Sequence, residues 1–403
     1  MFDAGTALKE ASFSGRVQAS DDQSLLDIDK KTRTSVLPWR GQFSPQLVEY
    51  FIRKNAPRSG VILDPFSGSG TVLYEAAALG HQAIARDINP AAIALAQASS
   101  ICVVPKPQRS IILEEVAAFA DKIKHRASQQ DGPLSVTYVA EMFRARQSEF
   151  TSADVVQAFV MSAFGDNTEL KIKSISRALN ATQRLVLGAP ETSQHLSVDV
   201  GDARDLGLPP DSVDYLITSP PYINVFNYHQ NYRPIIQALG HTPLAAARAE
   251  IGANRKFRMN RFITVAQYCI DIALFFGEAA QILRDGSPMT IVMGRESNVR
   301  GVSFKNGALV AAIASDGLGG VIESWNERSF LNRFGATIYE DVLTIIPKEN
   351  SSGVLEEVGR SVGTEALRAA LDYASEDRRA DIENAIIASH TVEASPYVLK
   401  EIT

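Results

Sequence analysis

A short apolar run that leads directly into a glycine-rich turn and then a helix is the feature that most constrains the fold. Residues 61–64 (VILD) predict a buried strand, and residues 65–71 (PFSGSGT) form the turn. The helical pattern that follows ends at Gly80, and residues 81–87 (HQAIARD) predict a second strand before another helix begins at Asn89. Strands that alternate with helices in this way are typical of an α/β protein with a parallel sheet.

The alternation of strands and helices stops near residue 105 and resumes at residue 196. Residues 105–195 have helical periodicity and predict a mainly helical insertion, whose role would be target recognition or dimerisation. From residue 196 the runs LSVDV, VDYLIT and MTIVMG predict further strands, and the closing runs GVIESW and YEDVLTII predict an antiparallel edge hairpin. We therefore expect a Rossmann-like α/β fold with a mostly parallel seven-stranded sheet, formed by residues 37–104 and 196–348.

The two ends of the chain differ from this central part. Residues 1–36 are polar without a sustained period, so we expect a poorly ordered N-terminal arm. Residues 349–403 contain 11 acidic and 5 basic residues and predict an acidic helical tail. The 403-residue chain is 45% hydrophobic, which is enough to bury a sizeable core and excludes a disordered or fibrous protein.

Composition also bounds where the protein works. The most apolar run, residues 270–283, contains Asp271 and Glu278, so no segment predicts a membrane span. The first ten residues lack the basic and apolar regions of a secretion signal. Two cysteines, Cys102 and Cys269, give no disulfide framework, and six scattered histidines lack metal-ligand spacing. We therefore expect a cytoplasmic protein with no metal site.

Two carboxylates flank the glycine-rich turn, because Asp64 ends the first strand and Asp87 ends the second. Glycine lets the backbone approach a ligand closely, and a carboxylate at the second position accepts hydrogen bonds from the hydroxyl groups of a ribose. The alternatives are a purely structural turn and an Asp87 that only stabilises the following helix. Because a third glycine is missing and Asp64 would repel a pyrophosphate, the turn favours S-adenosylmethionine, with its cationic group and amino-acid end, over a dinucleotide.

A second motif, Ser219-Pro220-Pro221-Tyr222, follows the apolar run that ends at Thr218. Two prolines remove two N–H donors, so the turn presents carbonyl oxygens at the end of its strand. The hydroxyl of Ser219 and the carbonyl of Pro220 would accept the hydrogens of an exocyclic amine, which localises the nitrogen lone pair for attack on a methyl sulfonium. Tyr222 offers a face on which an extruded base can stack.

Together, DPFSGSGT, ARDINPAAIALA and SPPY resemble the motifs of site-specific DNA amino-methyltransferases, which act on cytosine N4 or adenine N6. The resemblance covers residues 37–104 and 196–348 and implies an S-adenosylmethionine-dependent methyltransferase fold, with double-stranded DNA as the substrate. It implies that the catalytic residues are Ser219, Pro220, Pro221 and Tyr222. The cofactor contacts that it implies are Trp39, Phe43, Asp64, Pro65, Phe66, Gly68, Gly70, Thr71, Asp87, Ile88, Asp202 and Ala203.

The first residue of the second motif bears on the target base. Family members with Ser at the position of Ser219 are mostly cytosine-N4 enzymes, whereas adenine-N6 enzymes more often have Asp or Asn. Cytosine N4 is therefore favoured, with adenine N6 as the alternative. An RNA guanine-N2 methyltransferase and a catalytically silent nucleic-acid-binding subunit are further alternatives, whereas cytosine C5 methylation lacks the Pro-Cys that it needs.

A basic stretch after the second motif is our candidate for DNA contact. Residues 223–270 contain six basic residues and a single acidic residue, Glu250, in a chain of net charge −6. Basic side chains suit phosphates, and amide side chains suit base edges. The candidate DNA-binding residues are Asn227, Arg233, Arg255, Lys256, Arg258 and Arg261. Candidate protein partners are a second copy of the chain and a cognate restriction endonuclease or another defence-system protein.

Overall fold

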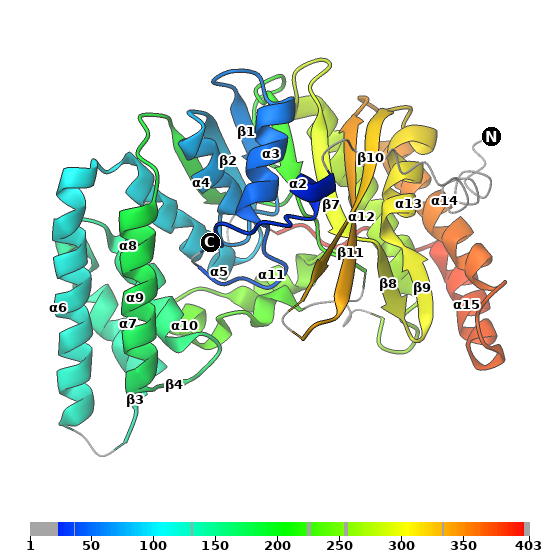
Figure 1. Cartoon of the computed structure of the whole chain (residues 1–403). Helices are drawn as coiled ribbons and strands as arrows, with labels where there is room; N and C mark the ends of the chain where they lie inside the picture. The colour runs from blue at the N-terminus through cyan, green and yellow to red at the C-terminus, as the bar shows by residue number, and fades with distance from the viewer. Residues whose placement is uncertain are drawn as a thin grey trace.

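A computed structural model describes residues 23–35, 37–129, 132–223, 227–253, 257–332 and 334–398. Its centre is a seven-stranded sheet with the strand order β10-β11-β7-β6-β1-β2-β5 (Figure 1). The strands are β1 (Val61–Asp64), β2 (Gln82–Asp87), β5 (Leu196–Val200), β6 (Tyr215–Thr218), β7 (Met289–Gly294), β10 (Val321–Leu331) and β11 (Thr337–Ile346). The first five are parallel, and β11 is antiparallel to both of its neighbours. The predicted Rossmann-like sheet with an antiparallel edge hairpin is confirmed.

Helices cover both faces of the sheet, because its central strands are apolar on both sides. On one face α3 (Pro45–Asn55) and α4 (Thr71–Ala78) pack around Ile62 of β1. On the other face lie α12 (Ile263–Ile282) and α13 (Asn306–Ala311). By length and composition α12 could cross a membrane, but 78% of its apolar window is buried inside the protein, as expected of a core helix.

The segment predicted as a helical insertion, residues 105–195, forms a layer of helices beside the sheet, on the left of Figure 1. Its elements are α6 (Arg109–Ser128), β3 (Leu134–Ser135), α7 (Val136–Arg144), α8 (Ala153–Phe164), β4 (Glu169–Leu170) and α9 (Ile172–Gly188). One apolar core joins α8 to α5 (Pro90–Ala96) and to the 3-10 helix η1 (Gln97–Val103). Buried Arg109 donates to the carbonyl oxygens of Val186 and Ala189, where a cation stabilises the end of α9.

Shorter elements complete the chain. Between β6 and α12 lie η4 (Tyr228–Gln230), α10 (Arg233–Ala238) and α11 (Pro243–Ala249). After β7 comes a small hairpin that the sequence did not predict, β8 (Glu296–Val299) with β9 (Val302–Lys305), and α13 continues into the π-helical turn η5 (Ala312–Gly317). Two single turns, η2 (Lys106–Gln108) and η3 (Gln147–Glu149), lie in the insertion.

The prediction of a poorly ordered N-terminal arm is wrong for residues 23–35. The short helix α2 (Gln23–Leu26) lies on the edge strand β10, and Leu26 is completely buried there. Gln23 Nε2 donates to the carbonyl oxygen of Glu327 at 2.9 Å, and Asp27 Oδ1 accepts from the N–H of Ser329 at 2.6 Å. These bonds use backbone groups that an edge strand would otherwise leave unpaired. One apolar anchor in a polar segment has no period, so the sequence could not reveal the docking. Residues 1–22 lie outside the described residues.

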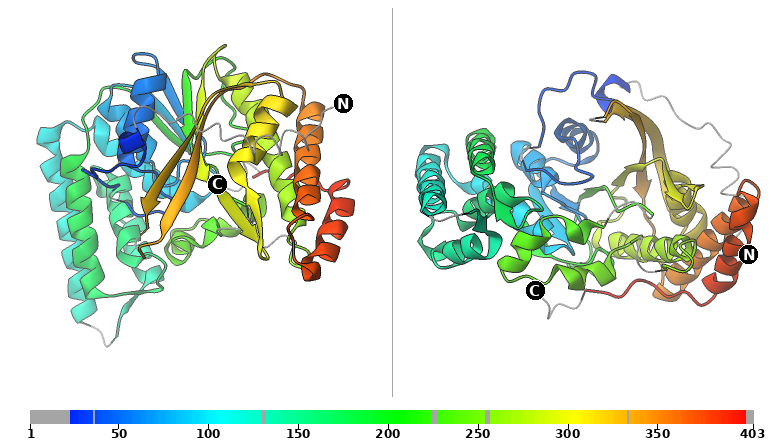
Figure 2. Two further views of the ribbon diagram at one scale, coloured as in Figure 1. Left: turned by 45° about the vertical axis from the view of Figure 1, so that its right-hand side comes forward. Right: turned by 90° about the horizontal axis from the view of Figure 1, so that it is seen from below.

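The C-terminal segment is helical as predicted, but it is not a tail, since α14 (Ser352–Ala370) and α15 (Glu376–Ser389) are packed parts of the fold. α14 lies against α12, and its glycines allow a close approach. A Cβ atom at Gly359 would lie 2.5 Å from Cα of Ile270, and one at Gly363 would lie 2.6 Å from Cα of Ala266. After α15 the chain returns along the side of the molecule that faces away from the viewer in Figure 1, at the lower edge of the right-hand view of Figure 2, towards α11.

Replacing Gly359 by alanine is expected to lower the free energy of unfolding by about 1–3 kcal/mol, the usual effect of overpacking a core. The added methyl group would collide with the backbone of α12, which cannot move aside as the end of a side chain can. Chemical denaturation measures the change. Gly353→Ala on the same helix is the control, because nothing lies within 4 Å of its Cβ position, and it is expected to be neutral or stabilising. Equal stability of the two variants would contradict the close packing.

Candidate functional site

One cavity lies at the carboxyl ends of β1, β2 and β6, where the strand order reverses: β2 and β5 lie on one side of β1, and β6 and β7 lie on the other. We call it the cofactor cavity; its volume is about 860 Å³. Gly68 of the glycine-rich turn and Ser219 of the second motif line the same space, although they are far apart in the sequence. The predicted cofactor residues that line it are Trp39, Phe43, Asp64, Pro65, Phe66, Gly68, Thr71, Asp87, Ile88, Asp202 and Ala203.

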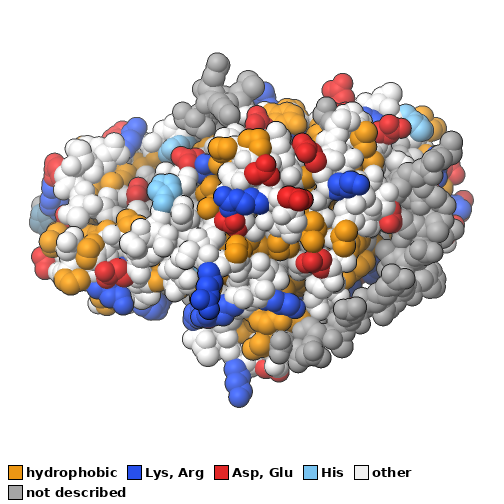
Figure 3. Space-filling model, turned by 90° about the horizontal axis from the view of Figure 1, so that it is seen from above, with side chains coloured by type: hydrophobic (Ala, Val, Ile, Leu, Met, Phe, Trp, Pro, Cys, Tyr) orange, Lys and Arg blue, Asp and Glu red, His pale blue; other side chains and the backbone are white. Residues whose placement is uncertain are grey.

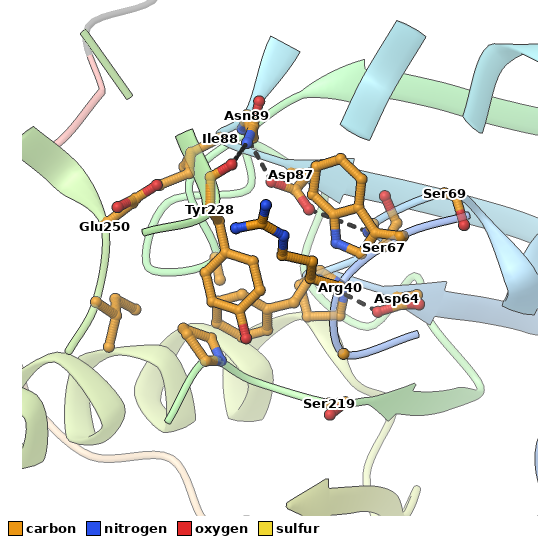
Figure 4. Close-up of a pocket in the computed structure, with 18 of the residues that line it drawn as sticks. Arg40, Asp64, Ser67, Ser69, Asp87, Ile88, Asn89, Ser219, Tyr228 and Glu250 are labelled. Carbon is orange, nitrogen blue, oxygen red and sulfur yellow. Dashed lines mark hydrogen bonds between the residues drawn. The ribbon is translucent and has the colours of Figure 1, made fainter. Parts of the chain in front are cut away.

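Asp87 holds the glycine-rich turn in shape. Its Oδ2 accepts from the N–H of Gly68 at 3.0 Å, and its Oδ1 accepts from the N–H of Asn89 at 2.9 Å (Figure 4). Gly68 has a φ of +50°, and a Cβ there would lie 2.7 Å from Cδ1 of Trp39. Only glycine therefore lets the turn pass beneath Trp39 while its backbone lines the cavity.

Asp64 joins the two motifs directly. Its Oδ1 accepts a 2.6 Å hydrogen bond from the hydroxyl of Thr218 and a 3.2 Å bond from the N–H of Phe66. Thr218 is the last residue of β6, and Ser219 follows it immediately. The carboxylate that begins the cofactor turn thus also positions the strand end that carries the second motif.

Burial makes the two carboxyl groups weaker acids than usual. It raises the pKa of Asp64 to about 7 and that of Asp87 to about 6, and the negative charge of Glu250 adds to the effect at Asp87. A cation in the cavity would lower both pKa values again, because it favours the ionised carboxylates. The cavity therefore fits S-adenosylmethionine, which has sulfonium and ammonium cations and a ribose whose hydroxyls can donate to Asp87.

Gly70 does not line the cavity, in contrast to its predicted contact with the cofactor. It caps the start of α4 with a φ of +82°, and a Cβ there would lie 3.1 Å from Cα of Ala96. Glycine is needed here for the close packing of the start of α4 against the end of α5. The structure therefore assigns Gly70 to the scaffold of the turn and Gly68 to its ligand side.

The second motif is divided between two environments. Ser219 and Pro221 line the cofactor cavity, whereas Pro220 and Tyr222 do not. Tyr222 OH lies 3.4 Å from the hydroxyl of Ser219, and a Cβ at Gly294 would lie 3.1 Å from Cε2 of the tyrosine ring. The ring therefore packs over the end of β7, next to the serine and outside the cofactor cavity.

The segment after the second motif closes the cofactor cavity, which the sequence did not predict. Asn89 Nδ2 donates to the carbonyl oxygen of Tyr228 at 2.9 Å, so the segment is tied to the end of β2. Glu250 lines the cavity, and its Oε2 lies 2.8 Å from Nδ1 of His229, with both side chains buried. In Figure 4, Tyr228 and Glu250 lie across the cavity from Asp64. Part of the predicted DNA-contact stretch is therefore a wall of the cofactor cavity.

Asp202 lines the cavity, but Arg204 occupies its carboxylate. Arg204 Nε donates to Asp202 Oδ1 at 2.8 Å, and its Nη2 donates to Oδ2 at 2.7 Å. The same guanidinium bonds Asp271 of α12 and the carbonyl oxygens of Ser395 and Pro396 in the returning C-terminal segment. This wall of the cavity is thus held by a buried cation that the sequence did not reveal.

Of the six candidate DNA-binding residues, the four that the structure describes do not line the cofactor cavity. Asn227, Arg233 and Arg261 are half-buried, and Arg258 is exposed, whereas Arg255 and Lys256 lie outside the described residues. Arg233 begins α10, with Nη1 3.4 Å from Oε1 of Gln230. Viewed from above, the described surface carries acidic and basic side chains close together (Figure 3). Their role in binding DNA stays a prediction.

Sequence reasoning missed several residues of the cavity. Arg40, Gly41 and Gln42 lie between two predicted residues, Trp39 and Phe43, so their place in the sequence could have indicated that they line the cavity. Ser67, Ser69 and Asn89 likewise neighbour predicted residues. Tyr228, Ala249, Glu250 and Ile251 had no such signal, because only the folding of the segment after β6 brings them over the end of β2.

The amino-terminal part of the chain is similar to known proteins. The DNA methylase family matches residues 20–98. The Type II methyltransferase M.MjaII of Methanocaldococcus jannaschii is 40% identical over 67 residues, which are 16% of this chain and 13% of that protein. The chain thus matches only about an eighth of the length of this relative. The predicted cofactor, S-adenosylmethionine, agrees with this family, because a DNA methylase needs a methyl donor.

Solved structures of low similarity were also found. An S-adenosylmethionine-dependent methyltransferase from Methanosarcina mazei aligns with a TM-score of 0.34 and 11% identity, over 74% of this chain and 98% of that one. A TehB-like methyltransferase from Corynebacterium glutamicum aligns with a TM-score of 0.30 and 10% identity, over 75% and 87%. These scores are too low to support an argument, so the fold stands on the strand order above. The resemblance drawn from the sequence agrees with the family match, which covers residues 20–98.

Proposed function

We propose that this protein is a site-specific DNA methyltransferase that acts on the exocyclic amine of a flipped base. One observation carries the proposal: Ser219 of the second motif and Gly68 of the cofactor turn line one cavity. Asp64 supports it, because its hydrogen bond to Thr218 couples the two motifs in space. A dinucleotide-dependent enzyme is disfavoured, since two carboxylates at the turn, buried Asp64 and half-buried Asp87, would repel a pyrophosphate.

Each motif has a distinct task in this proposal. S-adenosylmethionine, when bound, supplies a methyl group activated by a sulfonium. Asp87 accepts hydrogen bonds from the ribose hydroxyls, and the ionised carboxylate of Asp64 attracts the cationic end of the ligand. The carbonyl of Pro220 and the hydroxyl of Ser219 accept hydrogen bonds from the exocyclic amine, which makes its nitrogen a better nucleophile. Tyr222, beside Ser219, supports the base after it leaves the stack.

Cytosine N4 is our choice of target atom, with adenine N6 as the alternative. The serine at position 219 supports this choice through the resemblance described above. Because the similar protein of Methanocaldococcus jannaschii is a Type II methyltransferase, we propose double-stranded DNA as the substrate and a cognate restriction endonuclease as a partner. We further propose that the protein works in the cytoplasm.

Mass spectrometry of nucleosides tests the proposal. DNA from cells that express the chain is expected to contain N4-methylcytosine, and the same analysis resolves N6-methyladenine. With purified protein, Tyr222→Ala is expected to slow methyl transfer by roughly 5- to 150-fold, the loss of one base-stacking contact. Ser219→Ala is expected to slow it as well, whereas Ser110→Ala, on the exposed face of α6, serves as the control. Full activity of both motif variants, or unmodified DNA with the wild type, would overturn the proposal.

A further inference from the structure

A second cavity adjoins the cofactor cavity on the side of the edge strands, and we call it the outer cavity. It lies between residues 27–35, the loop that contains Gly41, and the hairpin of β10 and β11. Together with the open solvent at its mouth it encloses about 1520 Å³, which is more than the cofactor cavity encloses. The two cavities share Gly41, Gln42, Phe43 and Ser219. A group that reaches Ser219 from outside the cofactor cavity would therefore lie in this space.

A row of residues leads across the sheet from Ser219 into the outer cavity. In the sheet, Gly294 of β7 is paired with Glu340 of β11, and Glu340 is paired with Arg328 of β10. Directly paired residues present their side chains on the same face of a sheet. Tyr222, whose hydroxyl lies 3.4 Å from that of Ser219, packs over Gly294 at the start of this row. Tyr222, Glu340 and Arg328 therefore lie side by side.

Buried Arg328 and half-buried Glu340 form an ion pair that is incompletely satisfied. The side chain of Arg328 is only 5% exposed, and its Nε lies 3.5 Å from Oε2 of Glu340, too far for a strong hydrogen bond. Within the described part of the chain, this Nε has no hydrogen-bond partner. The guanidinium also lies 5.0 Å from the centre of the Phe330 ring. Buried polar groups are nearly always hydrogen-bonded, so an unsatisfied guanidinium nitrogen beside a cavity points to a missing partner.

The chemistry of the pair defines that partner. A guanidinium is a rigid fork of donors that binds two adjacent acceptors, and a carboxylate beside it holds the fork in place. Burial raises the pKa of Glu340, and Arg328 opposes this shift. Next to its exocyclic amine, cytosine has two adjacent acceptors, N3 and O2. Adenine has one, N1, followed by a C–H group. A base whose amine lies at Ser219 would present this edge along the row.

We propose that Arg328 reads the N3 and O2 edge of the target base and so selects cytosine, with Glu340 as the residue that positions its guanidinium. The inference rests on the proposed function, because it assigns the outer cavity to the base that is methylated. It extends that function by naming a specificity residue on β10, far in sequence from both motifs.

Arg328→Lys is the sharpest test, because it keeps the positive charge and removes the fork. We expect kcat/KM for DNA to fall by roughly 5- to 150-fold, the range for loss of a bidentate base contact, and the ratio of N4-methylcytosine to N6-methyladenine to fall with it. The dissociation constant for S-adenosylmethionine, measured by titration calorimetry, is expected to stay unchanged. Arg284→Lys is the matched control, since Arg284 forms an exposed pair with Asp214 and lines neither cavity.

A second variant keeps the test decisive if the pair also supports the fold. Glu340→Gln preserves the side-chain volume and is expected to reduce the same ratio by less than Arg328→Lys. Wild-type rate and product ratio in Arg328→Lys would overturn the inference, as would an equal loss of cofactor binding and activity in both variants. A wild type that forms only N6-methyladenine would overturn the selection of cytosine and leave the methyltransferase proposal intact. A wild type that modifies neither base would instead reject the proposed function itself.

Discussion

Replacing Asp87 by alanine is expected to weaken S-adenosylmethionine binding by about 100-fold, because hydrogen bonds to a charged group are each worth roughly 1.5–3 kcal/mol. The change removes the acceptor proposed for the ribose hydroxyls. It also removes the bonds that hold the N–H groups of Gly68 and Asn89. The glycine-rich turn would then lose its shape as well as its ligand contact. Titration calorimetry with the purified protein measures the dissociation constant.

Two further variants show whether the loss of binding is specific to the Asp87 carboxylate. Asp285→Ala changes an exposed carboxylate in the turn before β7, and it is expected to leave cofactor binding unchanged. Asp87→Asn keeps an acceptor but not the charge, so an intermediate affinity is expected. A thermal melt shows whether each variant is folded before it is titrated. Cofactor binding by folded Asp87→Ala that is as tight as in the wild type would contradict the assignment of this cavity.

Replacing Arg204 by methionine is expected to lower the free energy of unfolding by about 3–5 kcal/mol, the effect of leaving buried charges without their partner. The guanidinium is completely buried and is 2.7 Å from Asp202 and 2.6 Å from Asp271, two carboxylates that are also buried. It bonds the carbonyl oxygens of Ser395 and Pro396, and it lies 4.4 Å from the centre of the Tyr397 ring. Without the guanidinium, the two buried carboxylates would repel each other with no cation between them.

Urea denaturation measures this change in stability. Arg284→Met is the matched control, because Arg284 forms an exposed ion pair with Asp214 that is expected to contribute at most about 1 kcal/mol. Arg204→Met is also expected to release the C-terminal segment, which limited proteolysis would detect as early cleavage after α15. Equal denaturation midpoints for the two variants would show that the buried cluster does not stabilise the fold.

Much of the fold could be predicted from local patterns. The runs at residues 61–64 and 81–87 are short and bounded by turns, so both were predicted as strands, and the apolar run 61–64 as a buried one. The glycine turn and the Pro-Pro turn were recognisable because both change the backbone in ways that do not depend on distant contacts. For the same reason the site residues near these turns, such as Asp64, Phe66 and Ser219, were found and line the cofactor cavity.

Residues that act through distant contacts were not predictable in this way. Glu250 and Tyr228 reach the cofactor cavity because the segment after β6 folds back over β2. Arg204 appeared to be one more charged residue in a polar loop, yet it joins the loop after β5 to α12 and to the C-terminal segment. The docking of α2 on β10 and the close approach of α14 to α12 depend on one leucine and on two glycines, which carry no periodic signal.

By itself the sequence determined where the main strands lie along the chain, the two functional turns and the carboxylates beside them. These features depend on neighbours within a few residues. Only the tertiary structure decided which side chains close the cofactor cavity, and which buried charges support its wall. It alone placed Arg328 and Glu340 beside Tyr222. The physical reason is that strand pairing and helix packing join segments that are far apart in the chain, and the sequence specifies those contacts only through the fold as a whole.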